Sequence, residues 1–153
     1  MEDLTRLLRE HDFLKGLTEA QTHLLVSCAK NVRFNPGEFL LREGDAASTF
    51  YLVRSGQVAL ESHVPGRGVV QMESVGPDDV LGLSWPLPPH RVHMDARAAT
   101  PTIALAFDAA CLRAKIEADH DLGYALMMRL YEKALRRLEH IRLQRLDVYK
   151  PSR

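Results

Sequence analysis

Hydrophobic positions follow a helical spacing at both ends of the chain and an alternating spacing between them. Near the N-terminus, residues 3–10 carry leucines at i, i+3 and i+4, which predicts a short surface helix. A second helix is predicted over residues 18–29, because Thr18 can serve as its N-cap and Gln21 completes a capping box. The N-terminal segment is therefore expected to be helical.

Between residues 30 and 107 the pattern changes to short alternating or β-rich runs, each ended by a turn signal. The turn signals are Asn35-Pro36-Gly37, Glu43-Gly44-Asp45, Ser55-Gly56, Pro65-Gly66-Arg67-Gly68 and Gly76-Pro77-Asp78. Strands at this regular spacing, separated by glycine turns, predict an antiparallel sandwich or roll. With helices at either end, the predicted fold class is α+β.

Beyond residue 108 the spacing is helical again: Asp108 is expected to cap a short helix through Ile116, and a longer helix follows over residues 119–146. Apolar positions of the long helix step by 4, 3, 4 and 3, the stagger of a coiled coil. They are Met127, Tyr131, Ala134, Leu138 and Ile141, and the stripe is widened by Leu126, Leu130 and Leu135. A helix of about 28 residues extends about 42 Å, longer than a small domain needs to cover itself. We therefore expect a homodimer, with residues 1–118 forming the roll and its N-terminal helices, and residues 119–153 a dimer helix of the same domain.

A proline-rich stretch from Val80 to Thr100 interrupts the strands. Pro86, Pro88 and Pro89 exclude a regular helix and a central strand there. The stretch also holds the only tryptophan and a group of polar side chains, which are Ser84, His90, Arg91, His93, Asp95 and Arg97. Binding sites are commonly built on such loops between strands, so we place the candidate site here.

Composition bounds the classes of function. With 20 basic and 20 acidic residues, the chain lacks the basic excess of proteins that grip nucleic acid. It shows no apolar signal segment and no apolar run near the roughly 18 residues of a membrane helix, so we expect a cytoplasmic protein without membrane contact. Cys28 and Cys111 lie far apart and form no C-x-x-C motif; two reduced, buried thiols are the expectation, and a single disulfide is the alternative.

The order and spacing of the turns resemble those of one family. The residues that carry the resemblance are Asn35-Pro36-Gly37-Glu38, Glu43-Gly44-Asp45, Phe50-Tyr51-Leu52-Val53-Arg54-Ser55-Gly56 and Gly82. Together with the layout of the elements, they make nearly the whole chain similar to the cyclic nucleotide-binding domain of Crp/Fnr-type regulators. The resemblance implies an eight-stranded antiparallel β-roll, jelly-roll-like, with N-terminal helices and a long C-terminal dimerisation helix.

In that family the loop at the position of residues 82–95 is the phosphate-binding cassette. A Gly-Glu pair there opens a short helix, the Glu holds the ribose hydroxyl, and an Arg followed by Ser or Thr holds the cyclic phosphate. In this chain Leu83 stands at the Glu position and Val92 at the Arg position, with Arg91 one residue away. The cassette-like candidate ligand contacts are Gly82, Leu83, Ser84, Trp85, Arg91, Val92 and His93.

The altered anchors change the expected ligand. Two charged contacts to a cyclic nucleotide, each worth about 1.5–3 kcal/mol, are replaced. Cyclic AMP (cAMP) or cyclic GMP (cGMP) would therefore lose roughly two to four decades of affinity in the usual pose, unless Arg91 substitutes for the missing Arg. The family usually continues into a winged helix-turn-helix, for which a chain ending at Arg153 has no room, so direct DNA binding is not expected.

Several candidate residues also have a purely structural interpretation. Trp85 beside a proline either contacts the ligand or fills a gap in the core, and Arg91 either binds an anion or is solvated. Arg97 lies two positions from Asp95 on one sheet face, so it is expected to brace the loop within the chain. The basic residues of the last helix are expected to form a solvated flank; they are Arg129, Lys133, Arg136, Arg137, Arg142 and Arg145.

Metal binding and catalysis are not expected. His90, His93 and Asp95 are of metal-ligating types, but the sequence shows neither their convergence nor partners that would orient them. Ser84, His93 and Asp95 lack the nucleophile elbow and the oxyanion motif of a hydrolase. The chain is therefore not expected to be an enzyme, and no cofactor is assigned.

The leading hypothesis is a regulatory module that binds a small ligand against residues 82–95 and signals through a dimer helix to a protein partner. The ligand can be anionic, and it need not be a cyclic nucleotide. The alternative is a ligand-free interaction module whose pocket is filled by its own side chains, for which Leu83, Trp85, Leu87 and Val92 are apolar enough. A third hypothesis, a repressor that pairs with a full-length DNA-binding relative, rests on the long helix alone.

Overall fold

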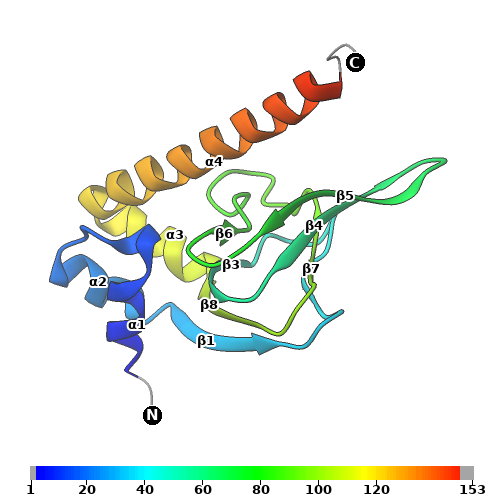
Figure 1. The fold of residues 1–153 in the computed structure, drawn as a ribbon. Coiled ribbons are helices and arrows are strands. Elements are labelled where there is room, and N and C mark those ends of the chain that lie inside the picture. Colours follow the sequence, from blue (N-terminus) through cyan, green and yellow to red (C-terminus); the bar gives the residue numbers. More distant parts are fainter. Residues whose placement is uncertain (1–2, 149–153) are drawn as a thin grey trace.

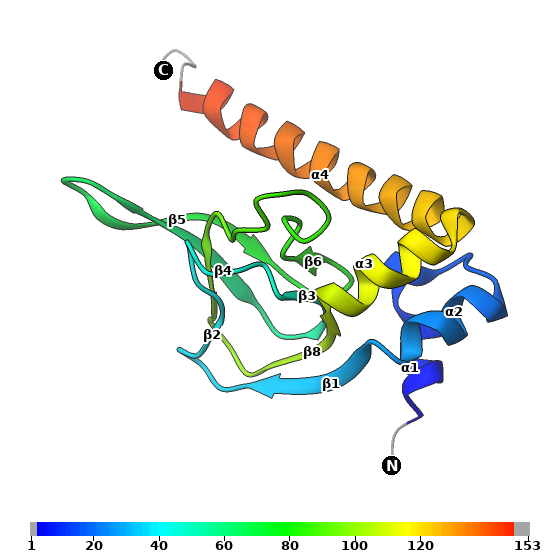
Figure 2. The same ribbon diagram turned by 180° about the vertical axis from the view of Figure 1, so that it is seen from behind.

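A computed structural model describes residues 3–148 of the chain. The strands form two four-stranded antiparallel sheets, with the order β1-β8-β3-β6 in one and β2-β7-β4-β5 in the other. The short helices gather at one end of the roll, and one long helix runs along its side (Figures 1 and 2). The predicted α+β fold, an eight-stranded antiparallel β-roll with N-terminal helices and a long C-terminal helix, is confirmed.

The elements follow the predicted order. The strands are β1 (Ala29–Phe34), β2 (Phe39–Leu41), β3 (Thr49–Ser55), β4 (Val58–Val64), β5 (Gly68–Val75), β6 (Val80–Leu81), β7 (Asp95–Ala98) and β8 (Thr102–Asp108). The helices are α1 (Leu4–Glu10), the short 3-10 helix η1 (Asp12–Leu14), α2 (Glu19–Val26), α3 (Ala109–Ala118) and α4 (His120–Val148). The predicted dimer segment continues to residue 153, so its last five positions lie outside the described residues.

The predicted capping box at the start of α2 is present, with reciprocal hydrogen bonds between Thr18 and Gln21 at 3.0 and 3.1 Å. The helix ends at Val26, three residues earlier than predicted. The reason is that Ala29 already pairs with Phe107 in the ladder between β1 and β8. A long-range strand pairing therefore overrides the local helical pattern.

The core has two parts because β3 is buried on both of its faces. Phe50 and Leu52 point to a cluster beneath the helices, whereas Tyr51 and Val53 point to the interior of the roll. This alternation explains why β3 carries a continuous apolar run rather than an alternating one. β8 is divided in the same way, with Leu105 and Phe107 in the first cluster and Ala104 and Ala106 in the second, so both strands join the helices to the roll.

Cys28 and Cys111 form a disulfide, so the expectation of two reduced thiols is wrong. Pairing of β1 with β8 brings the end of the α2 region beside the first turn of α3, where the backbone N–H of Asp108 donates to the carbonyl of Cys28 at 2.9 Å. The two Cα atoms are consequently 5.5 Å apart, a separation that suits a disulfide. The sequence separation of 83 residues gave no sign of this proximity.

The apolar contacts of α4 with the core come from its first half. Leu122, Leu126 and Leu130 are buried in the cluster beneath the helices, and Met127 packs against that cluster. Both views show that the second half of α4 continues past the short helices and over the loop between β6 and β7 (Figures 1 and 2). Within residues 3–148, no helix combines the length and the apolar content required to cross a membrane.

Candidate functional site

The predicted site is the loop of residues 82–94, which joins β6 to β7. It consists of turns and bends, with a cis peptide bond between Pro88 and Pro89 and a positive φ of 53° at His90. The short helix that opens the cassette in the resembling family is not formed within these residues. The loop therefore presents no helix N-terminus that could bind an anion.

Backbone hydrogen bonds fix this loop to the turn between β2 and β3. The N–H of Gly44 donates to the carbonyl of Val92 at 2.9 Å, and the N–H of Val92 donates to the carbonyl of Asp45 at 2.9 Å. The N–H of Ala47 donates to the carbonyl of His90 at 2.7 Å. Because two separate turns satisfy each other's backbone groups, the loop is held as part of the scaffold.

Gly82 sets the point where the loop leaves β6. Its φ is +87°, and a Cβ at this position would lie 2.9 Å from the carbonyl oxygen of Thr49 on β3. Both the left-handed backbone and the close approach of β3 require glycine. The cassette-like Gly82 is therefore a structural requirement of the loop, whatever the loop binds.

A cavity of about 180 Å³ lies between this loop, the roll and α4. Five of the predicted ligand contacts line it, namely Gly82, Leu83, Ser84, Val92 and His93. Leu41, Leu60, Leu81 and Met94 add apolar walls, and Arg137 of α4 lines the remaining side. The cavity thus joins the candidate loop to the long helix.

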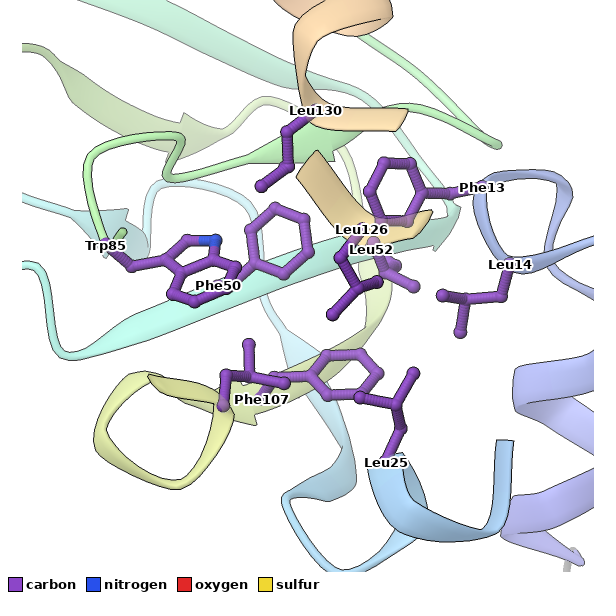
Figure 3. Close-up of a pocket in the computed structure, with 10 residues that line it drawn as sticks. Phe13, Leu14, Leu25, Phe50, Leu52, Trp85, Phe107, Leu126 and Leu130 are labelled. Carbon is purple, nitrogen blue, oxygen red and sulfur yellow. The ribbon is translucent and has the colours of Figure 1, made fainter. Parts of the chain in front are cut away.

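Trp85 does not line this cavity, although it was among the predicted ligand contacts. Its side chain is 0% exposed and lies in the core cluster, 5.9 Å from the ring centre of Phe50. Figure 3 shows the indole among apolar side chains from β3, β8 and the helices. The gap between them measures about 10 Å³, room for one water at most. Of the two interpretations of Trp85, the structure supports core filling.

Arg91 does not line the cavity either. It is exposed, and its backbone forms an isolated bridge with Ala46. Val92, the next residue, is the one whose side chain turns inward and contributes to the cavity wall. In this conformation Arg91 does not take the place of the missing cassette Arg.

Arg97 braces the chain internally, as predicted, but its partner is Glu61 of β4 rather than Asp95. The guanidinium donates from Nε to Glu61 Oε1 at 3.0 Å and from Nη2 to Oε2 at 2.8 Å. These hydrogen bonds lower the pKa of the Glu61 carboxyl. Asp95 instead accepts from the backbone N–H of Glu43 at 2.8 Å, which ties the start of β7 to the turn after β2.

Arg137 is a residue of the site, and the prediction that it lies on a solvated flank of the last helix is wrong. Its side chain is only 15% exposed, and Nη2 donates to the carbonyl of Val80 at 2.8 Å. Nε lies 3.5 Å from Glu73 Oε2, and Nη2 lies 3.7 Å from Asp79 Oδ1. The buried positions 122, 126 and 130 continue at 133 and 137 by helical steps, and this signal could have shown that Arg137 faces the roll.

The residues weighed for metal binding and catalysis are not assembled for either role. Within residues 3–148, no three His, Cys, Asp or Glu side chains are placed to hold a metal ion. Among these residues, no hydrogen bond joins Ser84 to His93 or His93 to Asp95. Arrangements of these side chains as a metal centre or a triad therefore have no geometric support in this part of the chain.

The family model of the cyclic nucleotide-binding domain matches residues 31–119, which include most of the roll, the candidate loop and α3. The chain belongs to this family. A solved structure of a candidate cyclic nucleotide-binding protein from Geobacter metallireducens GS-15 is 28% identical, with a TM-score of 0.79 over 90% of this chain and 99% of that one. The resemblance to the cyclic nucleotide-binding domain of Crp/Fnr-type regulators is thereby confirmed.

Curated relatives are much longer proteins. The cGMP-dependent protein kinase of Eimeria tenella is 29% identical over 89 residues, which is 58% of this chain and 8% of the kinase. That of Plasmodium berghei (strain Anka) is 24% identical over 76 residues, 50% of this chain and 8% of the kinase. The chain therefore spans less than a tenth of the length of these relatives.

Proposed function

We propose that this cyclic nucleotide-binding domain is a regulatory module that binds a small ligand in the cavity of the 82–94 loop and signals through α4. The observation that carries the proposal is that Arg137 of α4 lines the same cavity as the loop. A ligand that contacts both the 82–94 loop and Arg137 binds with different affinity to conformations that differ in the position of α4. Such a ligand biases the helix toward one of them, as linkage requires.

Cavity size and lining favour a compact ligand with an apolar part. The volume of about 180 Å³ is smaller than the roughly 300–1,000 Å³ of pockets for drug-sized ligands. Leu83 and Val92, at the two altered anchor positions, contribute apolar wall instead of the carboxylate and guanidinium of the family cassette. cAMP and cGMP remain candidates, but either one would require the loop or α4 to move outward.

The exposed face of α4 supports signalling through a second copy of the chain. Apolar side chains at steps of 4, 3, 4 and 3 are exposed to solvent here; they are Tyr124, Met128, Tyr131, Leu135 and Leu138. Three predicted positions differ from this stripe, since Met127 packs on the core, and Ala134 and Ile141 lie beside the stripe. A coiled-coil stagger is self-complementary, so we propose a homodimer along this stripe. We also propose that a protein partner recognises the arrangement of the two helices.

The ligand part of the proposal is tested by a thermal-shift titration with cAMP, cGMP and a panel of small metabolites. A ligand at 100 times its dissociation constant stabilises the folded state by about 2.7 kcal/mol, which corresponds to several degrees at this size. Met94→Trp fills the cavity and is expected to abolish the shift, whereas Leu87→Ala, at an exposed loop position, is expected to preserve it. Absence of any ligand-dependent shift would remove the sensor function.

The dimer part is tested by sedimentation equilibrium. Tyr131→Glu and Leu138→Glu place charges on the proposed interface and are expected to yield a monomer with an unchanged circular dichroism spectrum. Glu139→Gln, an exposed position of the same helix outside the stripe, is the matched control and is expected to remain dimeric. A wild-type protein that sediments as a monomer at tens of micromolar would overturn the proposed interface.

A ligand-free interaction module is the second candidate function, and the apolar walls formed by Leu83 and Val92 favour it. Two residues thought to fill the pocket do not do so, because Trp85 lies in the core and Leu87 is 73% exposed. This alternative predicts a dimer whose melting temperature no small molecule changes.

A further inference from the structure

Arg137 is the one Arg or Lys among the described residues that line the cavity. Of the nine other residues in the wall, six are leucine, valine or methionine, and the remaining three are Gly82, Ser84 and His93. The wall therefore offers few other polar groups to a charged ligand. A guanidinium in such surroundings is a strong point of attraction for a carboxylate or a phosphate, because it is always charged and presents several donors.

The partners of Arg137 within the protein do not satisfy all of its N–H donors. Its single hydrogen bond among the described residues goes to the carbonyl of Val80. The distances to Glu73 Oε2 and Asp79 Oδ1, 3.5 and 3.7 Å, exceed the roughly 2.7–2.9 Å of a charge-assisted hydrogen bond. The guanidinium therefore has donors left for a closer anion.

The Glu73 carboxylate gives a second, independent observation about the Arg137–Glu73 ion pair. Its Oε2 is buried and accepts no hydrogen bond among the described residues. A buried carboxylate oxygen in this state is costly, and the cost falls if the side chain turns to solvent. That movement is open to Glu73, since β5 is an edge strand of its sheet.

Asp79 differs from Glu73 because it keeps other partners. Its Oδ1 accepts from the backbone N–H of Val80 at 2.8 Å and lies 3.9 Å from Lys133 Nζ on α4. Loss of Arg137 would leave Asp79 paired, whereas Glu73 has only Arg137 as an ionic partner in the described part of the chain. Glu73 is thus the carboxylate that an incoming anion can displace.

We propose that Arg137 is the anion-binding residue of the cavity, and that the Glu73 carboxylate occupies it as an internal surrogate until a ligand anion takes its place. The proposal rests on the proposed function, since it requires a ligand in this cavity. The ligand is a compact molecule with an apolar body and one carboxylate or phosphate. The exchange breaks the ion pair between Arg137 of α4 and Glu73 of β5. Ligand binding therefore changes which position of α4 is favoured.

The test uses pairs of probes that differ in charge. Hexanoate with hexanamide and benzoate with benzamide are matched in shape, and cAMP is paired with adenosine, which lacks the phosphate. Affinities are measured by calorimetry for the wild type and for Arg137→Gln, Glu73→Gln and Lys133→Gln. We expect the anion of at least one pair to bind and its neutral counterpart to bind far more weakly. The pair that binds distinguishes a carboxylate from a phosphate.

The variants are expected to act in opposite directions. Arg137→Gln should weaken binding of the anion about 10- to 100-fold, because a charged contact is lost. Glu73→Gln should tighten it about tenfold, because the competing carboxylate is gone. Lys133→Gln removes a cation of the same helix that does not line the cavity, and should change affinity less than about threefold.

Two failures are distinguishable. If no probe or metabolite binds the wild type or Glu73→Gln, the proposed function fails and this inference fails with it. If a ligand binds but Arg137→Gln retains the wild-type affinity, or Glu73→Gln weakens it, the inference alone is overturned. Should Arg137→Gln not fold, Arg137→Lys and the sign of the Glu73→Gln effect still decide the question.

Discussion

Arg97 and Glu61 form a bidentate ion pair between β7 and β4, with hydrogen bonds of 3.0 and 2.8 Å. The two residues are diagonal neighbours on one sheet face, since Arg97 pairs with Ala59 and Glu61 lies two residues further along β4. This pair fastens the strand that follows the candidate loop. It therefore contributes to the rigidity of the loop without contacting the cavity.

Glu61→Gln is expected to lower the melting temperature by about 2–4 °C at pH 7. The hydrogen bonds from Arg97 lower the pKa of Glu61 in the folded state, so its contribution is fully present above the ordinary carboxyl pKa. It is lost as the pH falls through the lowered pKa, and the gap between variant and wild type should close there. Thermal melts from pH 7 to pH 2 measure this, with Glu132→Gln of an exposed pair as control. A gap independent of pH would contradict the assignment.

His11 connects α1 and η1 to the central strand. Its Nε2 lies 2.8 Å from the carbonyl of Val53, and its Nδ1 accepts from the N–H of Phe13 at 3.2 Å. Both bonds are made by the neutral ring that carries its proton on Nε2. Burial lowers the pKa of His11, against smaller raising effects of the bond to Val53 and of Asp78. Lys133 of α4 lowers it slightly, and Asp12 raises it slightly.

The neutral form of His11 therefore contributes stability above the ordinary histidine pKa, and this contribution is lost as the pH falls through the lowered pKa. In urea unfolding at pH 7.5 and pH 5.0, the wild type should lose more free energy of unfolding than His11→Gln does. The chain has seven histidines, and the comparison of the two proteins cancels the effect of the six that they share. Equal losses in both would show that His11 is not the group responsible.

Trp85→Ala is expected to destabilise the protein by about 3–5 kcal/mol, because it empties a fully buried aromatic position. Trp85→Phe should cost much less, since it retains most of the packing and removes an indole Nε1 that is buried without a hydrogen bond among the described residues. Chemical denaturation measures both. Because Trp85 does not line the cavity, Trp85→Phe should also keep any ligand-induced thermal shift. Loss of that shift in a well-folded Trp85→Phe would place the ligand in the core cluster instead.

Gly82→Ala is expected to destabilise more than Gly44→Ala. Both glycines have φ near +90°, which costs an alanine about 1 kcal/mol or more. At Gly82 the new Cβ would also meet the carbonyl oxygen of Thr49, whereas nothing lies within 4 Å at Gly44. The difference in the free energy of unfolding between the two variants isolates the close approach of β3. Equal costs would mean that the backbone angle alone accounts for glycine at position 82.

Local signals in the sequence were sufficient for most of the fold. The Thr18–Gln21 capping box, the cap of α3 at Asp108 and the turn glycines act within a few residues of themselves, and the structure contains them all. The β-rich run that forms β3 also predicted a strand correctly. These features depend on backbone geometry and on short-range periodicity, which a single sequence displays.

Long-range contacts were the part that the sequence did not reveal. The orientation of Trp85 depends on where α4 and Phe50 come to lie, and the disulfide depends on the pairing of β1 with β8. Arg97 pairs with Glu61 on another strand rather than with Asp95, which is closer to it in the sequence. Arg137 joins the site from a helix more than 40 residues beyond the loop. No local spacing records which distant segments become neighbours.

Methionine-methyl NMR tests the central claim, a ligand cavity shared by the loop and α4, most directly. The chain's five methionines include Met94 in the cavity wall, Met128 on the exposed stripe of α4 and Met127 against the core, and single Met→Leu variants assign them. In a titration with the ligand found by thermal shift, the Met94 methyl should move first and in proportion to occupancy, and the Met128 methyl should follow as α4 responds. A ligand that stabilises the protein and leaves the Met94 methyl unmoved would contradict the account.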